Sequence, residues 1–238
     1  MKTVLIYVLS ARMDPYDKLL DTSLQTWDRA PLEGTETIYY CGNGPRKVHP
    51  RIVYFNCNES YNGMAAKNIP AFEWAIANKK WDYMARVNAS CYVSKAKLLE
   101  DIQRLPEKGV FRGVGCGNHA NLHFLWGGAQ FILSRDVVDA MVSNRHKCDT
   151  TLMDDLSISK WVKDVGFDWD YKGRACSINR KGKGWFCIWY SEGKQGAFEF
   201  SHFSEMRNAD GQYFIRVKQD LRRHEDVQIM KELALYGI

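Results

Sequence analysis

The sequence lacks three patterns that identify common protein classes. No G-x-G-x-x-G follows its first apolar run, which argues against a nucleotide-dependent oxidoreductase. Its seven cysteines form no C-x-x-C or other metal-type pair, and their odd number argues against a disulfide framework, so we expect reduced thiols. The apolar run from Thr3 to Leu9 is too short to span a membrane, and no small-residue cleavage region follows it. We therefore expect a cytoplasmic protein without a membrane span.

The composition is otherwise that of a globular protein with a bias toward ligand binding. The chain has 238 residues, enough for one large domain with a buried core. Aromatic residues make up 13% of it, including eight Trp, and aromatic rings build flat binding surfaces as well as cores. The formal net charge of +5 is compatible with nucleotides, DNA or RNA as ligands, but selects none of them. The sequence leaves the oligomeric state open.

Hydrophobic patterns alternate along the chain between those of strands and those of helices. Apolar runs predict strands at residues 4–9, 37–41, 52–55, 83–87, 109–113, 126–134 and 167–171. Helical spacing predicts helices near residues 19–27, 61–78, 94–105, 135–142, 158–165 and 216–235. This order predicts an α/β fold, with a mostly parallel central sheet flanked by helices and joined by right-handed crossovers. After residue 171 the pattern weakens, so we expect a less regular C-terminal third.

Polar side chains follow the predicted strand at residues 83–87. Arg86, Asn88 and Ser90 form a polar tip between two apolar segments, and a helical pattern starts near Ser94. Open α/β sheets present ligand-binding groups at the carboxyl ends of their strands. The sequence therefore predicts a ligand site here, with no indication of which ligand it binds.

Five segments within residues 1–170 follow one another in the order of a known enzyme family. They are Gln25-Thr26-Trp27 (R-x-T-W in the family), Tyr61-Asn62 with Lys67 and Trp74 (Y-x-N-L-x-x-K…W), Tyr83-Met84-Ala85-Arg86-Val87 (Y-x-x-K-T), Trp126 to Ser134 (G-G-x-x-Y-x-L-S) and Asp154 to Ser159 (E-D-V-x-x-G). The sequence thus resembles the inverting nucleotide-sugar glycosyltransferases of the GT-A fold. Its nearest likeness is to the Fringe and β-1,3-galactosyltransferase type and to related viral and bacterial enzymes.

This resemblance implies a single GT-A-like glycosyltransferase domain over residues 1–238. Its donor nucleotide-binding half would be residues 1–93 and its acceptor half residues 94–238. The donor would be a nucleotide-diphosphate sugar, with UDP as the expected nucleotide. The residues expected to bind this donor are Ser10, Ala11 and Arg12 at the base and ribose, Arg86 at the diphosphate, and Lys67, Asn88, Ser90, Gly127 and Gly128. Two alternatives stay open: Arg86 pairs with Asp82 or another carboxylate, and the two glycines form only a bulge.

One departure from the family concerns the metal. Where the family has an acidic D-x-D that holds a divalent cation such as Mn²⁺ or Mg²⁺ against the diphosphate, this chain has Asn88-Ala89-Ser90. Neutral oxygens are poor ligands for a hard dication, so a requirement for metal stays open. Ser90 is one candidate ligand. By family analogy His202 is another, although most histidines in such apolar surroundings are core or surface residues.

The acidic pair Asp154-Asp155 supplies the predicted catalytic group. Inverting transfer needs a base that takes the proton from the acceptor hydroxyl, and the second acid of the family's motif, which matches Asp155, has that role. Two adjacent carboxylates also raise the pKa of one of them. The alternative is that both acids only cap the helix and complement its dipole.

The acceptor is the least specified part. Trp126, Trp185, Lys181 and Lys183 combine aromatic rings with positive charge, which suits a glycan and also suits DNA, including a hydroxymethylated base in phage or viral DNA. A solvated basic loop over aromatic core residues is the competing interpretation. A second class also stays open, a non-catalytic nucleic-acid- or glycan-binding protein that kept the GT-A scaffold.

Overall fold

The computed structural model describes residues 1–43, 49–60, 63–119, 122–128, 130–181, 184–208, 212–219 and 222–237. Among the residues named above, Tyr61, Asn62 and Lys183 lie outside these ranges. Six cysteines, Cys41, Cys57, Cys91, Cys148, Cys176 and Cys187, are free thiols. No helix in the described ranges is both long and apolar enough to cross a membrane.

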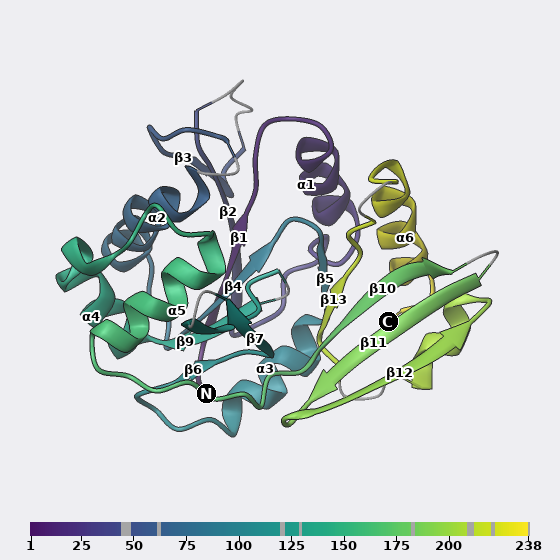
Figure 1. Ribbon diagram of the computed structural model, residues 1–238. Helices are drawn as coiled ribbons and strands as arrows, with labels where there is room; N and C mark the ends of the chain where they lie inside the picture. Colours follow the sequence, from purple (N-terminus) through teal and green to yellow (C-terminus); the bar gives the residue numbers. More distant parts are fainter. Residues whose placement is uncertain are drawn as a thin grey trace.

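A six-stranded sheet forms the centre of the molecule (Figure 1). Its first four strands are parallel and the fifth, β9, is antiparallel to its neighbours, so the predicted mostly parallel sheet is confirmed. In sheet order the strands are β3 (Ile52–Tyr54), β2 (Thr35–Cys41), β1 (Val4–Leu9), β4 (Tyr83–Asn88), β9 (Gln130–Ser134) and β6 (Phe111–Arg112).

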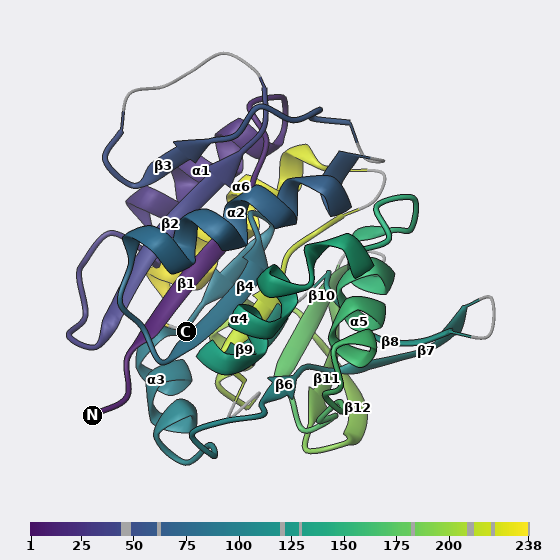
Figure 2. The same ribbon diagram turned by 90° about the vertical axis from the view of Figure 1, so that its left-hand side faces the viewer.

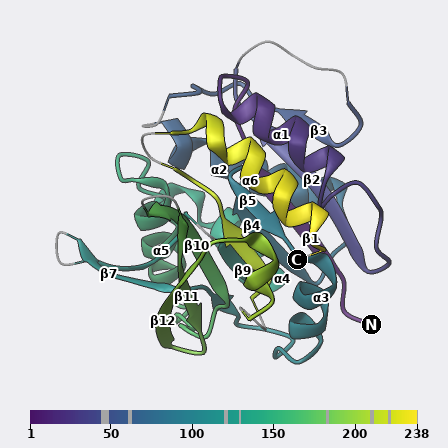
Figure 3. The same ribbon diagram turned by 90° about the vertical axis from the view of Figure 1, so that its right-hand side faces the viewer.

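Helices cover both faces of this sheet because β1 is apolar on both sides. Leu5 and Tyr7 belong to a core cluster with α2, α4 and α5, whereas Val4 and Ile6 belong to a cluster with α1, α3 and α6. Figure 2 shows the first set in front of the sheet, and Figure 3 shows α1 and α6 side by side on the other face. The helices are α1 (Tyr16–Gln25), α2 (Met64–Asn78), α3 (Lys95–Gln103), α4 (Arg135–Ser143), α5 (Asp154–Asp164) and α6 (His224–Leu235).

The C-terminal third is more regular than we expected. It contributes four strands to a second sheet, which β5 completes, in the order β12-β11-β10-β13-β5. Because β5 follows β4 after only two residues, the edge of this sheet lies at the carboxyl end of β4. The remaining elements are β5 (Cys91–Val93), β7 (Gly115–His119), β8 (Leu122–Leu125), β10 (Ala175–Lys181), β11 (Gly184–Ser191), β12 (Lys194–Phe200), β13 (Phe214–Arg216) and the 3-10 turns η2 (Arg145–Lys147) and η3 (Phe203–Asn208).

Several predicted elements differ from the structure. The strand predicted at residues 126–134 begins at Gln130, and the one predicted at 109–113 is only Phe111–Arg112. Residues 167–171 form no strand: only Asp170 bridges to Arg112 on the short edge strand β6, so the ladder does not extend. The predicted C-terminal helix begins at His224 rather than at Arg216, because Arg216 ends β13 and pairs with Cys91 of β5.

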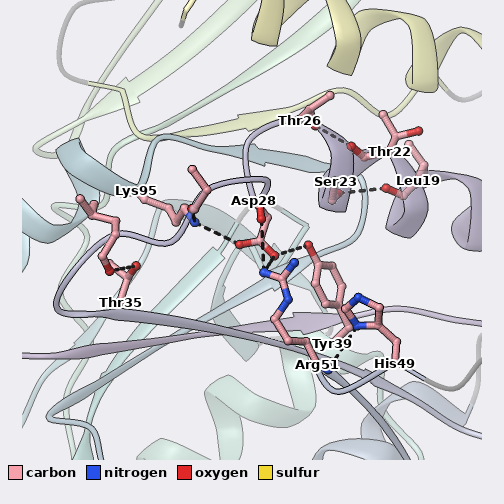
Figure 4. A network of polar contacts seen from close by, with 12 residues as sticks. Leu19, Thr22, Ser23, Thr26, Asp28, Thr35, Tyr39, His49, Arg51 and Lys95 are labelled. Atoms are coloured by element: carbon pink, nitrogen blue, oxygen red, sulfur yellow. Dashed lines mark hydrogen bonds and ion pairs between the residues drawn. The ribbon is translucent and has the colours of Figure 1, made fainter.

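A buried carboxylate joins four parts of the fold near the end of α1 (Figure 4). Asp28 is fully buried and accepts hydrogen bonds from the Tyr39 hydroxyl at 2.9 Å, from Arg51 Nη1 at 2.7 Å and from Lys95 Nζ at 3.1 Å. These partners come from β2, from the approach to β3 and from the start of α3. A buried carboxylate with two cationic partners and a hydroxyl has its lone pairs satisfied, so the network fixes these elements together.

We expect Asp28→Asn to lower the free energy of unfolding by about 3 kcal/mol, because it leaves Arg51 and Lys95 without their common anion. Denaturant unfolding measures the change. The matched control is Asp139→Asn, which removes an exposed i,i+4 pair with Arg135 and should cost less than about 1 kcal/mol. Equal losses for the two variants would show that the Asp28 network contributes no more than a surface pair.

Candidate active site

A pocket of about 290 Å³ opens where β1 and β4 end side by side. Leu9 and Asn88 are the last residues of these parallel strands and are partners in their register. Ser10 and Ala11, which follow β1, line the pocket, whereas Arg12 does not. The described lining residues are Leu9, Ser10, Ala11, Met13, Tyr16, Glu59, Met64, Lys67, Asn88, Ser90, Trp126, Gly127, Gly128, Asp154, Asp155, Arg216 and Lys218.

Lys67 on α2 lies in the wall of the pocket beside the segment after β1. Its side chain is buried, and Nζ donates to the Ser10 carbonyl at 3.1 Å and to Glu59 Oε2 at 2.5 Å. The other carboxylate oxygen of Glu59 accepts from the Gly42 backbone N–H. A buried lysine needs such a partner, and here the pair also holds the Ser10 backbone in place. Lys67 therefore shapes the expected donor site, with its charge balanced by Glu59.

Arg86 on β4 does not line the pocket but lies fully buried behind it. Its guanidinium forms an ion pair with Asp154 at the start of α5, donates to the Gly127 carbonyl at 3.0 Å and donates to the Tyr40 hydroxyl at 3.3 Å. Burial alone would lower the pKa of Arg86, but Asp154 and Tyr40 more than compensate, so its pKa is raised. Our expectation that Arg86 meets a diphosphate is thus corrected: the structure shows the alternative, a pair with a carboxylate.

Asp154 is fixed by the same network. Asn68 on α2 donates to its Oδ1 and accepts from Tyr40 at 2.7 Å, while Arg86 holds Oδ2. Both carboxylate oxygens are therefore occupied, and the side chain is buried. This arrangement corrects the expectation that Asp154 shares the catalytic role, because a base needs an oxygen that reaches the substrate.

Asp155 is oriented differently. It lines the pocket, and its Oδ1 accepts only a local hydrogen bond among those described here, from the Leu156 backbone N–H at 3.1 Å. Burial raises the pKa of this carboxyl, and the negative charge of Asp154 raises it further. Met153 is the N-cap residue of α5 and neither acid forms a side-chain cap, but both acids lie in the first turn, where they complement the helix dipole. Asp155 is thus a partly buried carboxylate with a raised pKa, which lies in the first turn of α5 and lines the pocket.

Gly127 and Gly128 leave room for side chains from both sides of the pocket. A Cβ on Gly127 would lie 2.8 Å from the Cβ of Asp155, and one on Gly128 would overlap the guanidinium of Arg216. That guanidinium stacks on the Trp126 ring, with 4.8 Å between Arg216 Cζ and the ring centroid. The two glycines thus allow Asp155 and Arg216 to approach the backbone closely, which gives them a steric role rather than that of a bulge.

The residues present do not fit a divalent cation. Asn88 Oδ1 is buried without a hydrogen-bond partner, so it is available to a ligand, but it and the Ser90 hydroxyl are neutral. Of the carboxylates that line the pocket, Glu59 and Asp154 are already paired with cations. Across the described ranges, no group of three or more His, Cys, Asp or Glu side chains has the arrangement of a metal site.

His202 and Trp185 lie in a second pocket, away from Asn88 and Ser90. There the Trp185 ring is covered by Arg180, whose Cζ lies 4.5 Å from the ring centroid, and His202 Nδ1 lies 3.4 Å from the Tyr236 hydroxyl. The expectation that His202 completes a site with Ser90 is therefore corrected. Trp185 is likewise separated from Trp126. Lys181 ends β10, and its side chain lies outside the described atoms, as does Lys183.

Sequence reasoning missed several pocket residues. Glu59 and Met64 lie in or beside an irregular connection without a motif. Arg216 and Lys218 were assigned to a helix, although the alternation of apolar and polar residues from Ile215 to Lys218 is typical of a strand end and would have indicated β13. Met13 and Tyr16 also line the pocket.

Comparison with known proteins supports one fold. No family model matches the chain. A mouse (Mus musculus) protein, UDP-GalNAc:beta-1,3-N-acetylgalactosaminyltransferase 2, is 20% identical over 148 residues, which is half of this chain and 27% of the length of that relative. A crystal structure of a glycosyltransferase involved in the glycosylation of the major capsid of PBCV-1 superposes with a TM-score of 0.55 at 9% identity, covering 96% of this chain and 99% of that one. The chain therefore has the α/β fold of this glycosyltransferase, which confirms the predicted fold class.

The raised pKa of Asp155 predicts how stability depends on pH. A carboxyl whose pKa is higher in the folded state binds protons more tightly there, so its ionisation lowers stability as the pH rises. We expect Asp155→Asn to be more stable than the wild type at about pH 7 and to match it at about pH 4, the ordinary aspartate value. Thermal unfolding across this range measures the difference.

Asp149→Asn is the matched control with the opposite sign. The Thr151 hydroxyl lowers the pKa of Asp149, so this carboxylate stabilises the fold above its ordinary pKa. Its replacement should lower the unfolding temperature at neutral pH. If Asp155→Asn also lowered it there, the pKa of Asp155 would not be raised in the folded protein.

Proposed function

We propose that the protein is an inverting glycosyltransferase that moves a sugar from a nucleotide-diphosphate donor to an acceptor hydroxyl, with Asp155 as general base. The observation that carries this proposal is the placement of Asp155. It faces a pocket at the carboxyl ends of β1 and β4, the part of an α/β sheet where ligands bind, on a fold shared with a glycosyltransferase.

The donor nucleotide is proposed to bind along the segment that follows β1. Ser10, Ala11 and Tyr16 line this side of the pocket. Asn88 Oδ1, buried and without a partner, is placed to accept a hydrogen bond from a ribose hydroxyl. UDP is the proposed nucleotide, since the mouse relative is by name a UDP-GalNAc transferase and the sequence resembles UDP-dependent enzymes.

In the proposed reaction the carboxylate of Asp155 accepts the proton of the acceptor hydroxyl. The acceptor oxygen then forms a bond to the anomeric carbon, and the bond from that carbon to the diphosphate oxygen breaks on the opposite face. The electron pair leaves with the nucleoside diphosphate, and the anomeric configuration inverts. A raised pKa makes Asp155 a stronger base than an ordinary aspartate, which lowers the barrier to proton transfer.

Asp154 and Arg86 are proposed to act through Asp155 as positioning residues. Their buried pair fixes the first turn of α5 against β4, and Arg86 also holds the Gly127 carbonyl beside Asp155. The negative charge of Asp154 contributes to the raised pKa of Asp155. Burial is the larger cause of that raised pKa, and Arg86 opposes it, so the main proposed role of the pair is to fix the place of the base.

A glycan is the proposed acceptor. Trp126 lines the pocket beside Gly127, and its ring contacts Tyr190 on β11 edge to face, with centroids 5.9 Å apart. Aromatic rings at the rim of a sugar-binding site stack on the apolar faces of sugar rings. A DNA acceptor would give binding that weakens steeply with salt, because phosphate contacts release counterions.

Nucleotide release from UDP-, GDP-, CDP- and dTDP-sugars, with water or a simple saccharide as acceptor, tests the function. We expect one donor to be turned over, and Asp155→Asn to slow turnover by about 10²- to 10⁴-fold while nucleotide affinity is kept, because only the proton acceptor is lost. The matched control is Asp168→Asn, an exposed acid paired with Lys163 after α5, which should keep full activity.

Two outcomes contradict the proposal in different ways. Turnover by Asp155→Asn at the wild-type rate would remove Asp155 from the chemistry. Nucleotide binding without turnover of any donor would instead identify a binding protein on a glycosyltransferase scaffold. Proton NMR of the product tests inversion, since retention of the anomeric configuration would rule out a single displacement.

A further inference from the structure

Two cationic side chains line the pocket beside the segment that replaces the acidic metal motif. Arg216, the last residue of β13, pairs with Cys91, and the Val217 N–H donates to the Ser90 carbonyl at 2.9 Å. The strand end of β13 therefore runs alongside Asn88-Ala89-Ser90. Arg216 and Lys218 line the same pocket as Asn88 and Ser90.

Both cations line the pocket from the end of β13 and the residues that follow it. Arg216 is the last residue of β13, and Val217 and Lys218 continue the chain beyond the strand. Val217 is fully buried, whereas Arg216 and Lys218 are partly exposed and line the pocket. Two positive charges therefore lie together near the end of β4.

The charges around the pocket leave an excess of positive charge. Lys67 and Glu59 form one pair, and the buried pair of Asp154 with Arg86 lies behind the wall. Among the described lining residues, Asp155 is the acid outside these pairs. Arg216 and Lys218 also interact electrostatically with the buried Asp226, which forms its own ion pair with Arg223. A pocket with this balance favours an anion, and its two cations carry the same charge as one divalent metal ion.

The neutral segment at the end of β4 fits the same ligand. Two carboxylates at these positions would repel a diphosphate unless a metal ion lay between them. Asn88 and Ser90 remove that repulsion and offer hydrogen-bonding groups instead. The neutral residues Asn88 and Ser90 and the nearby cations Arg216 and Lys218 therefore both favour the binding of a diphosphate.

Arg216 is held in place before any ligand arrives. Its guanidinium stacks on Trp126 at 4.8 Å and lies against the backbone of Gly128, where a Cβ would displace it. A planar guanidinium held in this way presents two parallel N–H donors to phosphate oxygens. Lys218 adds a second charge on the same side.

Building on the proposed function, we propose that Arg216 and Lys218 bind the diphosphate of the donor and neutralise it as it leaves, in the place of a divalent cation. During transfer the broken bond leaves its electron pair on the diphosphate oxygen. The two cations stabilise that developing charge, so that neither binding nor departure requires a metal ion.

Titration calorimetry of the full chain with UDP, GDP, CDP and dTDP, in EDTA and then with Mn²⁺, tests this proposal. We expect one nucleoside diphosphate to bind with the same dissociation constant, within about twofold, in both conditions. Arg216→Gln and Lys218→Gln should each weaken its binding in EDTA by about tenfold or more, the loss typical of a charged hydrogen bond. The same variants should leave the affinity for the corresponding nucleoside, which has no phosphate, unchanged.

Lys231→Gln is the matched control, since Lys231 is exposed on α6 and lines neither pocket. It should bind the diphosphate like the wild type. Thermal unfolding of each variant separates lost affinity from lost folding.

Three results would overturn the inference. Affinity lost in EDTA and restored by Mn²⁺ would assign the diphosphate to a metal and leave the proposed function intact. Wild-type affinity in both Arg216→Gln and Lys218→Gln would do the same. Binding of none of the four nucleotides would overturn this inference together with the proposed function.

Discussion

The buried ion pair between Arg86 on β4 and Asp154 on α5 connects the sheet to the pocket. Arg86 is fully buried, so its charge would destabilise the fold without a partner, and Asp154, Tyr40 and the Gly127 carbonyl provide one. The same contacts fix the first turn of α5 and the segment that carries the glycines. Asp155 is therefore held at the pocket by a pair whose polar groups bond to each other and to the protein. A carboxylate positioned by buried neighbours in this way is less mobile than one on a free loop.

The central sheet is the part of the fold that the sequence predicts well. The run Val4 to Leu9 is apolar at every position, which only a strand covered on both faces requires, and β1 is such a strand. The second sheet was not predicted, and the reason is physical. Strands β10, β11 and β12 pair as consecutive antiparallel hairpins, but most of their residues are only partly buried, so the alternation of apolar and polar residues is weak there. The segment that contains Arg216 was predicted as part of a helix, although Ile215 to Lys218 alternates between apolar and polar residues as a strand end does.

The candidate site was predictable where one strand end or one motif determines it. Asn88 follows β4 and Asp155 begins a helix, and both meet at the pocket as their positions in the chain indicate. The partner of Arg86 was not predictable, because Asp154 lies 68 residues away and only the folded chain brings it near. The prediction that His202 lies near Ser90 was wrong, because its place too depends on how distant segments fold together. Its apolar neighbours in the sequence do not indicate where it lies, and the segment after β12 places it in the second pocket.

The proposed reaction requires a nucleoside diphosphate to bind in the first pocket, next to Asp155. A crystal structure of the protein with the tightest-binding nucleoside diphosphate tests this most directly. We expect the base and ribose along Ser10 and Ala11, the phosphates between Gly128 and the pair Arg216 and Lys218, and Asp155 facing the vacant sugar position. Density in the second pocket at Trp185 and His202, with the first pocket empty, would contradict the account.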